Sequence, residues 1–551
     1  MSDCSTGPQA GTATLDSTTT PTKTLTAKRS ATLSLIALAR ATERFTLASD
    51  GTAIAVPLHG PQIVRRIGSK EYADELARRY ASHHQEAASK PSLTDAIAVL
   101  QAEAMSAERE AVSLRIAHPE PDVVVVDLGD AAGTSVVIDE GGYHVTDDAT
   151  ALFERTALTG TLVVPDGIID FDELGEIFNL DDANLHLLVG WLVASLLDVP
   201  CPILFLTGEQ GTGKSTTARF CVRLLDPGPA LTRPAPDDVK DWIFAASNSR
   251  VIAIDNLSNV TPKLSDALCQ AVTGGAVVER KLYTDSELVI HEFKRSVIIT
   301  SIDAGAIRGD LGERLLFVEL NPISDDRRAT EKSLVGRFEE NAQAILGALY
   351  ELTHRVIVAS RDIDLKTLPR MADFAEVLAA VDQIMDWETL PLYLETIARV
   401  SEDVVRGDPL PAALMEFVRR CPDGRWEGCA AELFDAIESY RPLRAAWPKA
   451  ANQLSNALKR LMPDLRKAGL EVEKKRTNKG GFISLQLVNS DAVTISDDRF
   501  TTPSVANRGV SGQEHDQSTF QPPHLLQESL QPPSPPSLSH IQATTPWIAA
   551  S

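Results

Sequence analysis

The sequence predicts an α/β protein built around a parallel sheet. One short apolar run is followed at once by a glycine-rich stretch, Gly208–Ser215, and then by an amphipathic segment, Thr216–Leu225, an order typical of strand, loop and helix. Further apolar runs resemble buried parallel strands. The four predicted strands are Ile203–Thr207, Arg250–Asn256, Ser296–Ser301 and Leu315–Leu320. With 551 residues, of which 43% are hydrophobic, the chain can bury several cores.

The glycine-rich stretch matches the phosphate-binding pattern G-x-x-x-x-G-K-[ST] at all four fixed positions, Gly208, Gly213, Lys214 and Ser215. Its glycines allow backbone N–H groups to surround phosphate oxygens, and the helix that follows presents its positive end. Lys214 would contact the β- and γ-phosphates, and the Ser215 hydroxyl would ligate Mg²⁺. The stretch predicts binding of ATP with Mg²⁺, the alternative being an ordinary glycine turn. The other residues expected at the nucleotide are Glu209, Gln210, Gly211, Thr212 and Thr216.

A second predicted strand ends in Asp255, where a strand beside the loop strand would place its carboxylate to hold the Mg²⁺ shell. The alternative is a plain carboxylate at a strand end. Asn256 follows, where many such ATPases carry a glutamate base. An amide cannot accept a proton but can position water. The predicted activity is ATP hydrolysis, with Asn256 in the position that orients the attacking water.

The segment after Asp255 contains two β-prone runs separated by Asp285 and Ser286, which predict a hairpin. The third buried strand then ends in Thr300 and Ser301, whose hydroxyls could sense a γ-phosphate or the attacking water. Arg314 directly precedes the last apolar strand.

This order of motifs resembles the superfamily 3 helicases of the AAA+ class, and most of all the phage and plasmid primase-helicase ATPases. The resemblance implies a homo-oligomeric ring whose hairpin touches single-stranded DNA through Arg280, Lys281 and Lys294. It implies a sensor at Thr300 or Ser301. It also implies an arginine finger, best matched by Arg314 and next by Arg308, and a weaker phosphate sensor at Arg370. Surface ion pairs are the alternative for these arginines.

Near the C-terminus, Trp426–Ile437 has helical spacing, and Leu454, Leu458, Leu461 and Leu465 form the stripe of a second helix. Two β-prone runs with a basic tip follow, so the segment predicts a winged helix that binds duplex DNA. Residues 441–480 hold eleven basic and three acidic residues, a net charge of +8. A merely solvated face or a protein-docking module is the alternative. The candidate DNA contacts are Lys459, Arg460, Arg466, Lys467, Lys474, Lys475 and Arg476.

The formal charge of −23 argues against a general nucleic-acid coat, so DNA contacts must be local. No apolar run approaches the roughly 18 residues of a membrane span, so no membrane partner is expected. Six cysteines without a C-x-x-C pair predict a reduced, cytoplasmic setting.

The predicted parts are a disordered tail (1–30), an α/β accessory domain (31–165), a P-loop AAA+-type core (166–322), a helical lid (323–421), a winged helix (422–488) and a disordered Pro/Gln/Ser-rich tail (489–551).

These observations predict an ATP-dependent DNA helicase or translocase in the replication of a phage, prophage or mobile element. The accessory domain shows no nucleotidyl-transfer residues, so priming would need a separate primase or other replication proteins. The alternative is a non-translocating ATP switch, either a DNA-bound regulator or a signalling ATPase. Asn256 and the acidic charge favour the switch, whereas the hairpin and Arg314 favour the helicase.

Overall fold

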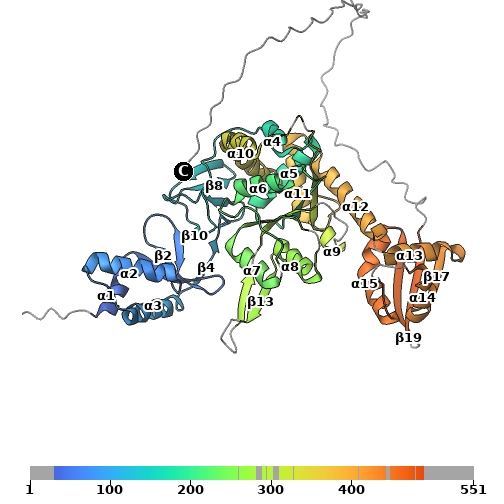
Figure 1. Cartoon of the computed structure of the whole chain (residues 1–551), viewed down its shortest axis with the longest axis horizontal. Helices are drawn as coiled ribbons and strands as arrows, with labels where there is room; N and C mark the ends of the chain where they lie inside the picture. Colours follow the sequence, from blue (N-terminus) through green and yellow to red (C-terminus); the bar gives the residue numbers. More distant parts are fainter. Residues whose placement is uncertain are drawn as a thin grey trace, which may run out of the picture. The chain divides into compact units, whose positions relative to one another are not determined.

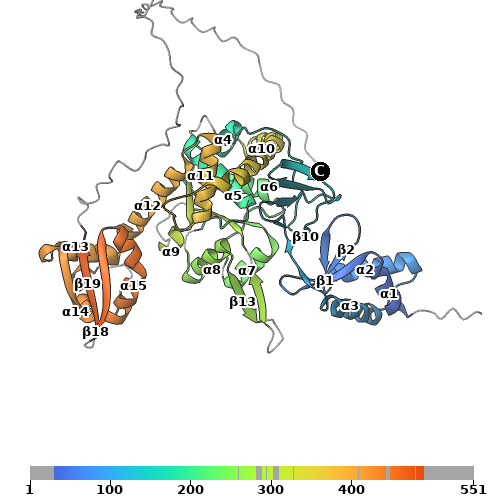
Figure 2. The same ribbon diagram turned by 180° about the vertical axis from the view of Figure 1, so that it is seen from behind.

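The computed structural model describes residues 30–488 apart from 237, 258–259, 281–287, 293, 302–308, 325, 327, 408, 442–446 and 478–479. Figures 1 and 2 show it from opposite sides. The predicted disordered tails, residues 1–30 and 489–551, lie outside the described residues except for Ser30. No helix in the described part of the chain is long and apolar enough to cross a membrane.

The N-terminal part consists of a six-stranded sheet in the order β4-β1-β2-β3-β10-β5 and three helices (Figure 1). Serine N-caps begin the helices: the Ser69 hydroxyl, for example, accepts from the Tyr72 N–H at 3.1 Å. One face of α2 is buried through Tyr72, Leu76 and Tyr80 at four-residue spacing. The elements are α1 (Ala31–Arg40), β1 (Glu43–Ala48), β2 (Ala53–Pro57), β3 (Ile63–Arg66), α2 (Lys70–His84), α3 (Lys90–Ala104), β4 (Arg109–Glu110), β5 (Val112–Ser113) and β10 (Leu152–Glu154).

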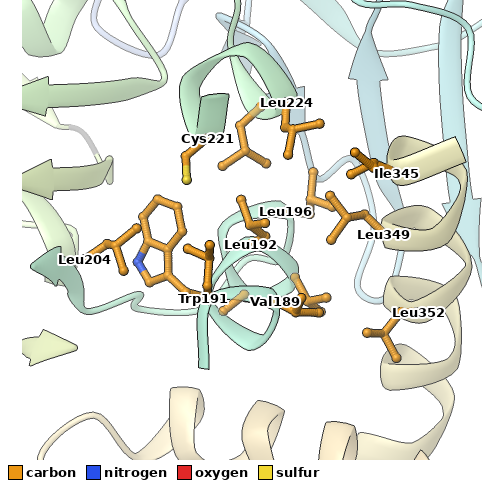
Figure 3. Packing of buried hydrophobic residues seen from close by; sticks show 14 of the residues in the cluster. Val189, Trp191, Leu192, Leu196, Leu204, Cys221, Leu224, Ile345, Leu349 and Leu352 are labelled. Carbon is orange, nitrogen blue, oxygen red and sulfur yellow. The ribbon is translucent and has the colours of Figure 1, made fainter. Parts of the chain in front are cut away.

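A second, antiparallel sheet has the order β6-β7-β8-β9. The apolar side chains of one of its faces belong to the same buried cluster as those of α5 (Asp182–Leu196) and α10 (Glu331–Ala359). In Figure 3, leucines of α5 face Ile345, Leu349 and Leu352 of α10. This cluster therefore crosses the boundaries predicted near residues 165 and 322. The strands are β6 (Ile116–Ala117), β7 (Val124–Asp127), β8 (Ser135–Asp139) and β9 (Gly142–Thr146).

A buried arginine ties this second sheet to the central one. Arg115 is fully buried and donates to the carbonyl oxygens of Asp127 at 2.8 Å and Gly160 at 2.7 Å. Its Nε donates to Asp226 Oδ1 at 3.2 Å, and Asp226 Oδ2 accepts from the Arg250 N–H at 2.7 Å. Because Arg250 directly precedes a central strand, this network fixes where that strand begins.

The central sheet is parallel and has the order β12-β15-β11-β16. The four predicted strands are all present, but the prediction that the Asp255 strand lies beside the loop strand is wrong, because β15 lies between them. Backbone pairing of Leu204 with Ile298, and of Ile252 with Val297, fixes this order. The strands are β11 (Ile203–Thr207), β12 (Val251–Ile254), β15 (Ser296–Thr300) and β16 (Leu315–Glu319).

Helices cover both faces of this sheet, since alternate residues of each strand point to opposite sides. Leu204 and Leu206 pack in the cluster formed with α5, α6 and α10, whereas Ile203 and Phe205 pack with α7 and α8. Such burial explains why these strands read as continuous apolar runs. The remaining helices are α4 (Asp172–Phe178), α6 (Lys214–Leu225), α7 (Val239–Asn248), α8 (Pro262–Thr273), α9 (Gly309–Gly312), α11 (Ala372–Met385) and α12 (Thr389–Gly407).

The C-terminal part has its own core, which begins at Leu410 rather than at the predicted boundary of residue 422. The leucine stripe of α15 is buried in it, as predicted, and the helix is followed by Gly469 at φ +84°. Its sheet has the order β17-β19-β18. The elements are α13 (Pro409–Arg419), β17 (Arg425–Cys429), α14 (Ala430–Ile437), α15 (Ala451–Lys467), β18 (Leu470–Thr477) and β19 (Gly480–Leu487).

The helix predicted over Trp426–Ile437 is wrong in its first turn, because residues up to Cys429 form a strand. Trp426 pairs with Leu485 of β19 in an antiparallel ladder. The helix begins only at Ala430, where the Glu432 carboxylate accepts from the Cys429 N–H at 2.7 Å. Tertiary pairing thus overrides the local helical spacing.

Candidate functional site

The glycine-rich loop connects the carboxyl end of β11 to the first turn of α6. Gly208, Gly211 and Gly213 have φ values of +134°, +86° and +95°, a region that favours glycine. A side chain at Gly208 would also meet the Leu320 carbonyl and the Thr212 hydroxyl, each at 3.0 Å. The loop therefore needs the glycines that the motif specifies, and its helix starts at Lys214.

A cavity of about 550 Å³ opens at this carboxyl edge of the sheet. Most residues predicted at the nucleotide line it, whereas Gly208 and Glu209 form the start of the loop. A cavity at the carboxyl ends of parallel strands is the usual ligand site of such sheets. Its lining residues are Gln210, Gly211, Thr212, Gly213, Lys214, Ser215, Thr216, Asp255, Asn256, Thr300 and Ser301.

Lys214 places a cation against its own loop. Its Nζ donates to the carbonyl oxygens of Gly208 at 2.8 Å and Glu209 at 2.6 Å. Partial burial lowers the pKa of Lys214, while the Asp255 carboxylate acts in the opposite direction. The ammonium group therefore lies against the loop carbonyls, among the polar residues that line the cavity.

Ser215, in the first turn of α6, and Asp255, which follows β12, meet although β15 separates β12 from the loop strand β11. The Ser215 hydroxyl donates to Asp255 Oδ1 at 2.7 Å. A hydroxyl and a carboxylate are hard oxygen ligands, the kind that Mg²⁺ takes from proteins while substrate phosphates and water complete its shell. These two residues therefore fit the predicted Mg²⁺ of a nucleotide. No cluster of three or more His, Cys, Asp or Glu that could hold a metal occurs among the described residues.

Asn256 occupies a left-handed backbone conformation with φ +56°. Asparagine tolerates this region better than most other residues, including glutamate. Its N–H donates to the Thr300 hydroxyl at 2.8 Å, and its place in the cavity wall lies next to Asp255. The turn geometry thus gives a physical reason for an amide where many such ATPases carry a glutamate base.

Arg314 lies at the edge of the sheet where its parallel strands begin, opposite the carboxyl edge at which the cavity opens. It directly precedes β16, and its carbonyl oxygen accepts from the N–H of Ile203, the first residue of β11, at 2.8 Å. The five residues of β11 separate that edge from the glycine-rich loop. At the usual rise per residue, the distance between the two ends of the strand is about 15 Å. Neither Arg314 nor Arg370 lines the cavity.

Arg370 is also at this opposite edge. Its Nη1 donates to Glu313 Oε2 at 2.8 Å, and Glu313 is the neighbour of Arg314 in the chain. Arg370 thus makes the ion pair that was the alternative to a phosphate sensor, and phosphate sensing by Arg370 stays a prediction. Arg308, the alternative finger, lies outside the described residues.

The predicted hairpin exists as β13 (Ala276–Arg280) paired antiparallel with β14 (Leu288–Glu292). Its predicted turn at Asp285 and Ser286 and the contact residue Lys281 lie outside the described residues, as does the side chain of Arg280. Lys294 pairs with Asp198 at 2.5 Å.

The basic residues of the C-terminal part fall into two groups. Lys459 and Arg466 are exposed on α15, off the buried leucine stripe. Lys474 is half-buried and donates to the Ser455 hydroxyl at 2.8 Å, a bond that joins β18 to α15, and its DNA contact stays a prediction. Lys475 is exposed and pairs with Glu473 at 2.8 Å. The side chains of Arg460, Lys467 and Arg476 lie outside the described part.

Sequence reasoning missed Asn179, which supports the glycine-rich loop from behind. It follows α4 with φ +57°, and its Nδ2 donates to the Thr212 carbonyl at 3.3 Å and to the Asn321 carbonyl. The Asn321 N–H in turn donates to the Asn179 carbonyl at 3.0 Å. An asparagine at the end of a helix was the available signal, but it did not indicate this contact.

Comparisons with known proteins give matches of different kinds. No curated protein matches the chain. A solved structure described as the A form apo structure of the NrS-1 C-terminal region is 11% identical, covers 82% of this chain and 98% of its own, and has a TM-score of 0.40. Another, described as the apo structure of the same region, is 12% identical, covers 84% and 100%, and has a TM-score of 0.38.

Two family models match consecutive parts of the chain. Residues 171–403 match the actinomycete integrative conjugative element replication protein, and residues 410–499 match the C-terminal domain of that replication protein. The second match starts at Leu410, where the C-terminal core also starts. In chain order, these two matches fit a replication protein of a mobile element.

Proposed function

We propose that this chain is an ATP-dependent DNA helicase or translocase that acts in the replication of a mobile element. The observation that carries the proposal is the cavity in which the glycine-rich loop, Lys214 and the Ser215–Asp255 pair converge. The matches to a replication protein supply the biological setting. The core would be a P-loop ATPase of the AAA+ type, in keeping with the resemblance of its motifs.

In this proposal each residue of the cavity has a role toward Mg-ATP. The loop N–H groups and the start of α6 face the phosphates, and Lys214 neutralises charge on the β- and γ-phosphates. Ser215 and Asp255 would hold Mg²⁺, which offsets charge on the phosphate oxygens. The Asn256 side chain would orient the attacking water, because an amide can hold water without accepting its proton.

The position of Arg314 supports a ring in which each pocket is shared. An arginine about 15 Å from its own loop cannot reach its own nucleotide. In a head-to-tail ring, the same edge of one subunit can face the cavity of the next. Arg314 would then stabilise the transition-state charge of a neighbour's ATP.

DNA would be engaged at two places. The β13–β14 hairpin belongs to the ATPase core and would contact single-stranded DNA in the ring. The C-terminal part, with helices followed by the β18–β19 hairpin, would act as a winged helix on duplex DNA. Because the whole chain carries −23, the local basic face of α15 must supply this second contact.

The duplex contact can be tested with the double variant Lys459→Ala/Arg466→Ala in the full chain. Each exposed cation that neutralises a phosphate releases counterions, so the slope of log affinity against log salt should flatten by about 2. Turnover of ATP without DNA should stay at the wild-type rate. The measurement is duplex binding by fluorescence anisotropy over a series of salt concentrations.

Arg425→Ala is the matched control, because Arg425 is exposed in the same domain but pairs with Glu427 on β17. Its salt slope should equal that of the wild type. Equal slopes for the wild type and the double variant would contradict a DNA contact through α15. The domain would then be a protein-docking module.

The second candidate is a non-translocating ATP switch, in which nucleotide binding only drives assembly. Two observations favour it: Asn256 stands where a base was expected, and its left-handed turn disfavours a glutamate. The two functions differ in one property. Single-stranded DNA should raise ATP turnover in a helicase and leave it unchanged in a switch.

A further inference from the structure

Thr300 lies at the end of β15, between the loop strand and the Asp255 strand, and is buried. Its hydroxyl donates to Asp255 Oδ1 at 2.6 Å and accepts from the Asn256 N–H at 2.8 Å. Because β15 lies between β11 and β12, Thr300 at its carboxyl end lies between the ends of these two strands. No such position would exist if β12 paired directly with β11. It contacts both residues expected to serve Mg²⁺ and water.

Thr300 has no hydrogen left for a phosphate in this arrangement. A threonine hydroxyl has one donor and two acceptor lone pairs, and the donor is given to Asp255. The neighbouring Ser301 hydroxyl is also buried and donates to the Leu257 carbonyl at 2.8 Å. A phosphate oxygen accepts hydrogen bonds and cannot donate them, so neither hydroxyl can sense the γ-phosphate while these bonds hold.

We propose that Thr300 is a positioning residue, which orients the Asp255 carboxylate toward Ser215 and Mg²⁺ rather than reading the γ-phosphate. The inference rests on the proposed binding of Mg-ATP. Both hydroxyls, those of Ser215 and Thr300, donate to the same oxygen, Oδ1. The two bonds restrain the position of Oδ1, and with it the Asp255 carboxylate that would hold Mg²⁺.

The same hydroxyl also holds Asn256 in place. Without this hydroxyl, the Asn256 N–H would lose its hydrogen bond. The left-handed backbone conformation of Asn256 would then lose that support. Thr300 therefore couples the orientation of the metal-side acid to the position of the amide beside it. Groups that orient a metal ligand typically change metal affinity about 10- to 100-fold when they are removed.

The test compares Thr300→Val, which keeps the shape and loses the hydroxyl, with Thr300→Ser, which keeps the hydroxyl. Binding of a fluorescent ATP analogue is measured while Mg²⁺ is varied, and again in EDTA. For Thr300→Val we expect the Mg²⁺ concentration at half-saturation to rise about 10-fold or more. Binding in EDTA should be unchanged, and Thr300→Ser should stay within about twofold of the wild type.

Thr353→Val is the matched control, because it makes the same change at a buried threonine of α10 that does not line the cavity and whose hydroxyl donates to the Leu349 carbonyl at 2.7 Å. Its Mg²⁺ requirement should equal that of the wild type. If Thr300→Val does not fold, Thr300→Cys replaces it with the same expectation. A folded variant with unchanged Mg²⁺ requirement but reduced turnover would overturn the proposal in favour of a γ-phosphate sensor. A wild-type protein that binds no ATP analogue would instead overturn the proposed function itself.

Discussion

Lys214→Ala should lower the affinity for Mg-ATP about 100-fold, or ~3 kcal/mol, while the fold is retained. Among the residues that the structure describes, Lys214 is the one cation that lines the cavity. Its loss removes a charge-assisted bond to the phosphates, and no other described side chain of the lining can replace that charge. The check is the dissociation constant for a fluorescent ATP analogue, measured together with the thermal unfolding of the variant.

Arg223→Ala provides the control for this substitution. Arg223 lies on the same helix, α6, but pairs with Glu339 of α10 at 3.0 Å and does not line the cavity. Its ATP affinity should match that of the wild type. A folded Lys214→Ala protein with wild-type affinity would remove the basis for a phosphate-binding loop.

Arg314→Ala should bind ATP normally and lose turnover by roughly 1,000-fold, since a finger acts on transition-state charge and not on the bound ground state. The control is Arg355→Ala, which removes a half-exposed arginine of α10 that pairs with Glu351. It should turn over ATP at the wild-type rate. Steady-state kinetics with nucleotide binding on the same samples separates the two effects.

Mixing experiments then show whether Arg314 acts on a neighbour. When Arg314→Ala and Lys214→Ala subunits assemble together, some pockets combine an intact loop with an intact arginine from the next subunit. At equal amounts, and with independent pockets, roughly a quarter of wild-type turnover should return. Absence of rescue, with a monomer at every ATP concentration, would contradict the shared pocket.

Much of the core could be predicted from local sequence. The glycine motif specifies backbone conformations, and the structure has Gly208 and Gly213 at the positive φ values that such a loop needs. The four apolar runs are strands because the sheet is covered on both faces. Asp255 was expected near Ser215, and the two lie in hydrogen-bond contact.

The errors have a common physical origin, which is that they concern contacts between distant segments. The order of strands depends on backbone pairing, so nothing local places β15 between β11 and β12. The ion pair of Arg370 with Glu313 could not be predicted from the motif either, because it joins residues 57 positions apart. The strand at Trp426 likewise depends on its partner β19, more than fifty residues later.

The most direct test of the account is ATP turnover by the full chain with and without single-stranded DNA. The proposed helicase function, in which the β13–β14 hairpin is coupled to the nucleotide cavity, predicts that saturating single-stranded DNA raises turnover several-fold and that Lys214→Ala abolishes both rates. DNA binding is measured on the same samples, so that failure to bind is not mistaken for lack of coupling. Turnover that stays unchanged when single-stranded DNA is bound would contradict a helicase and favour the ATP switch.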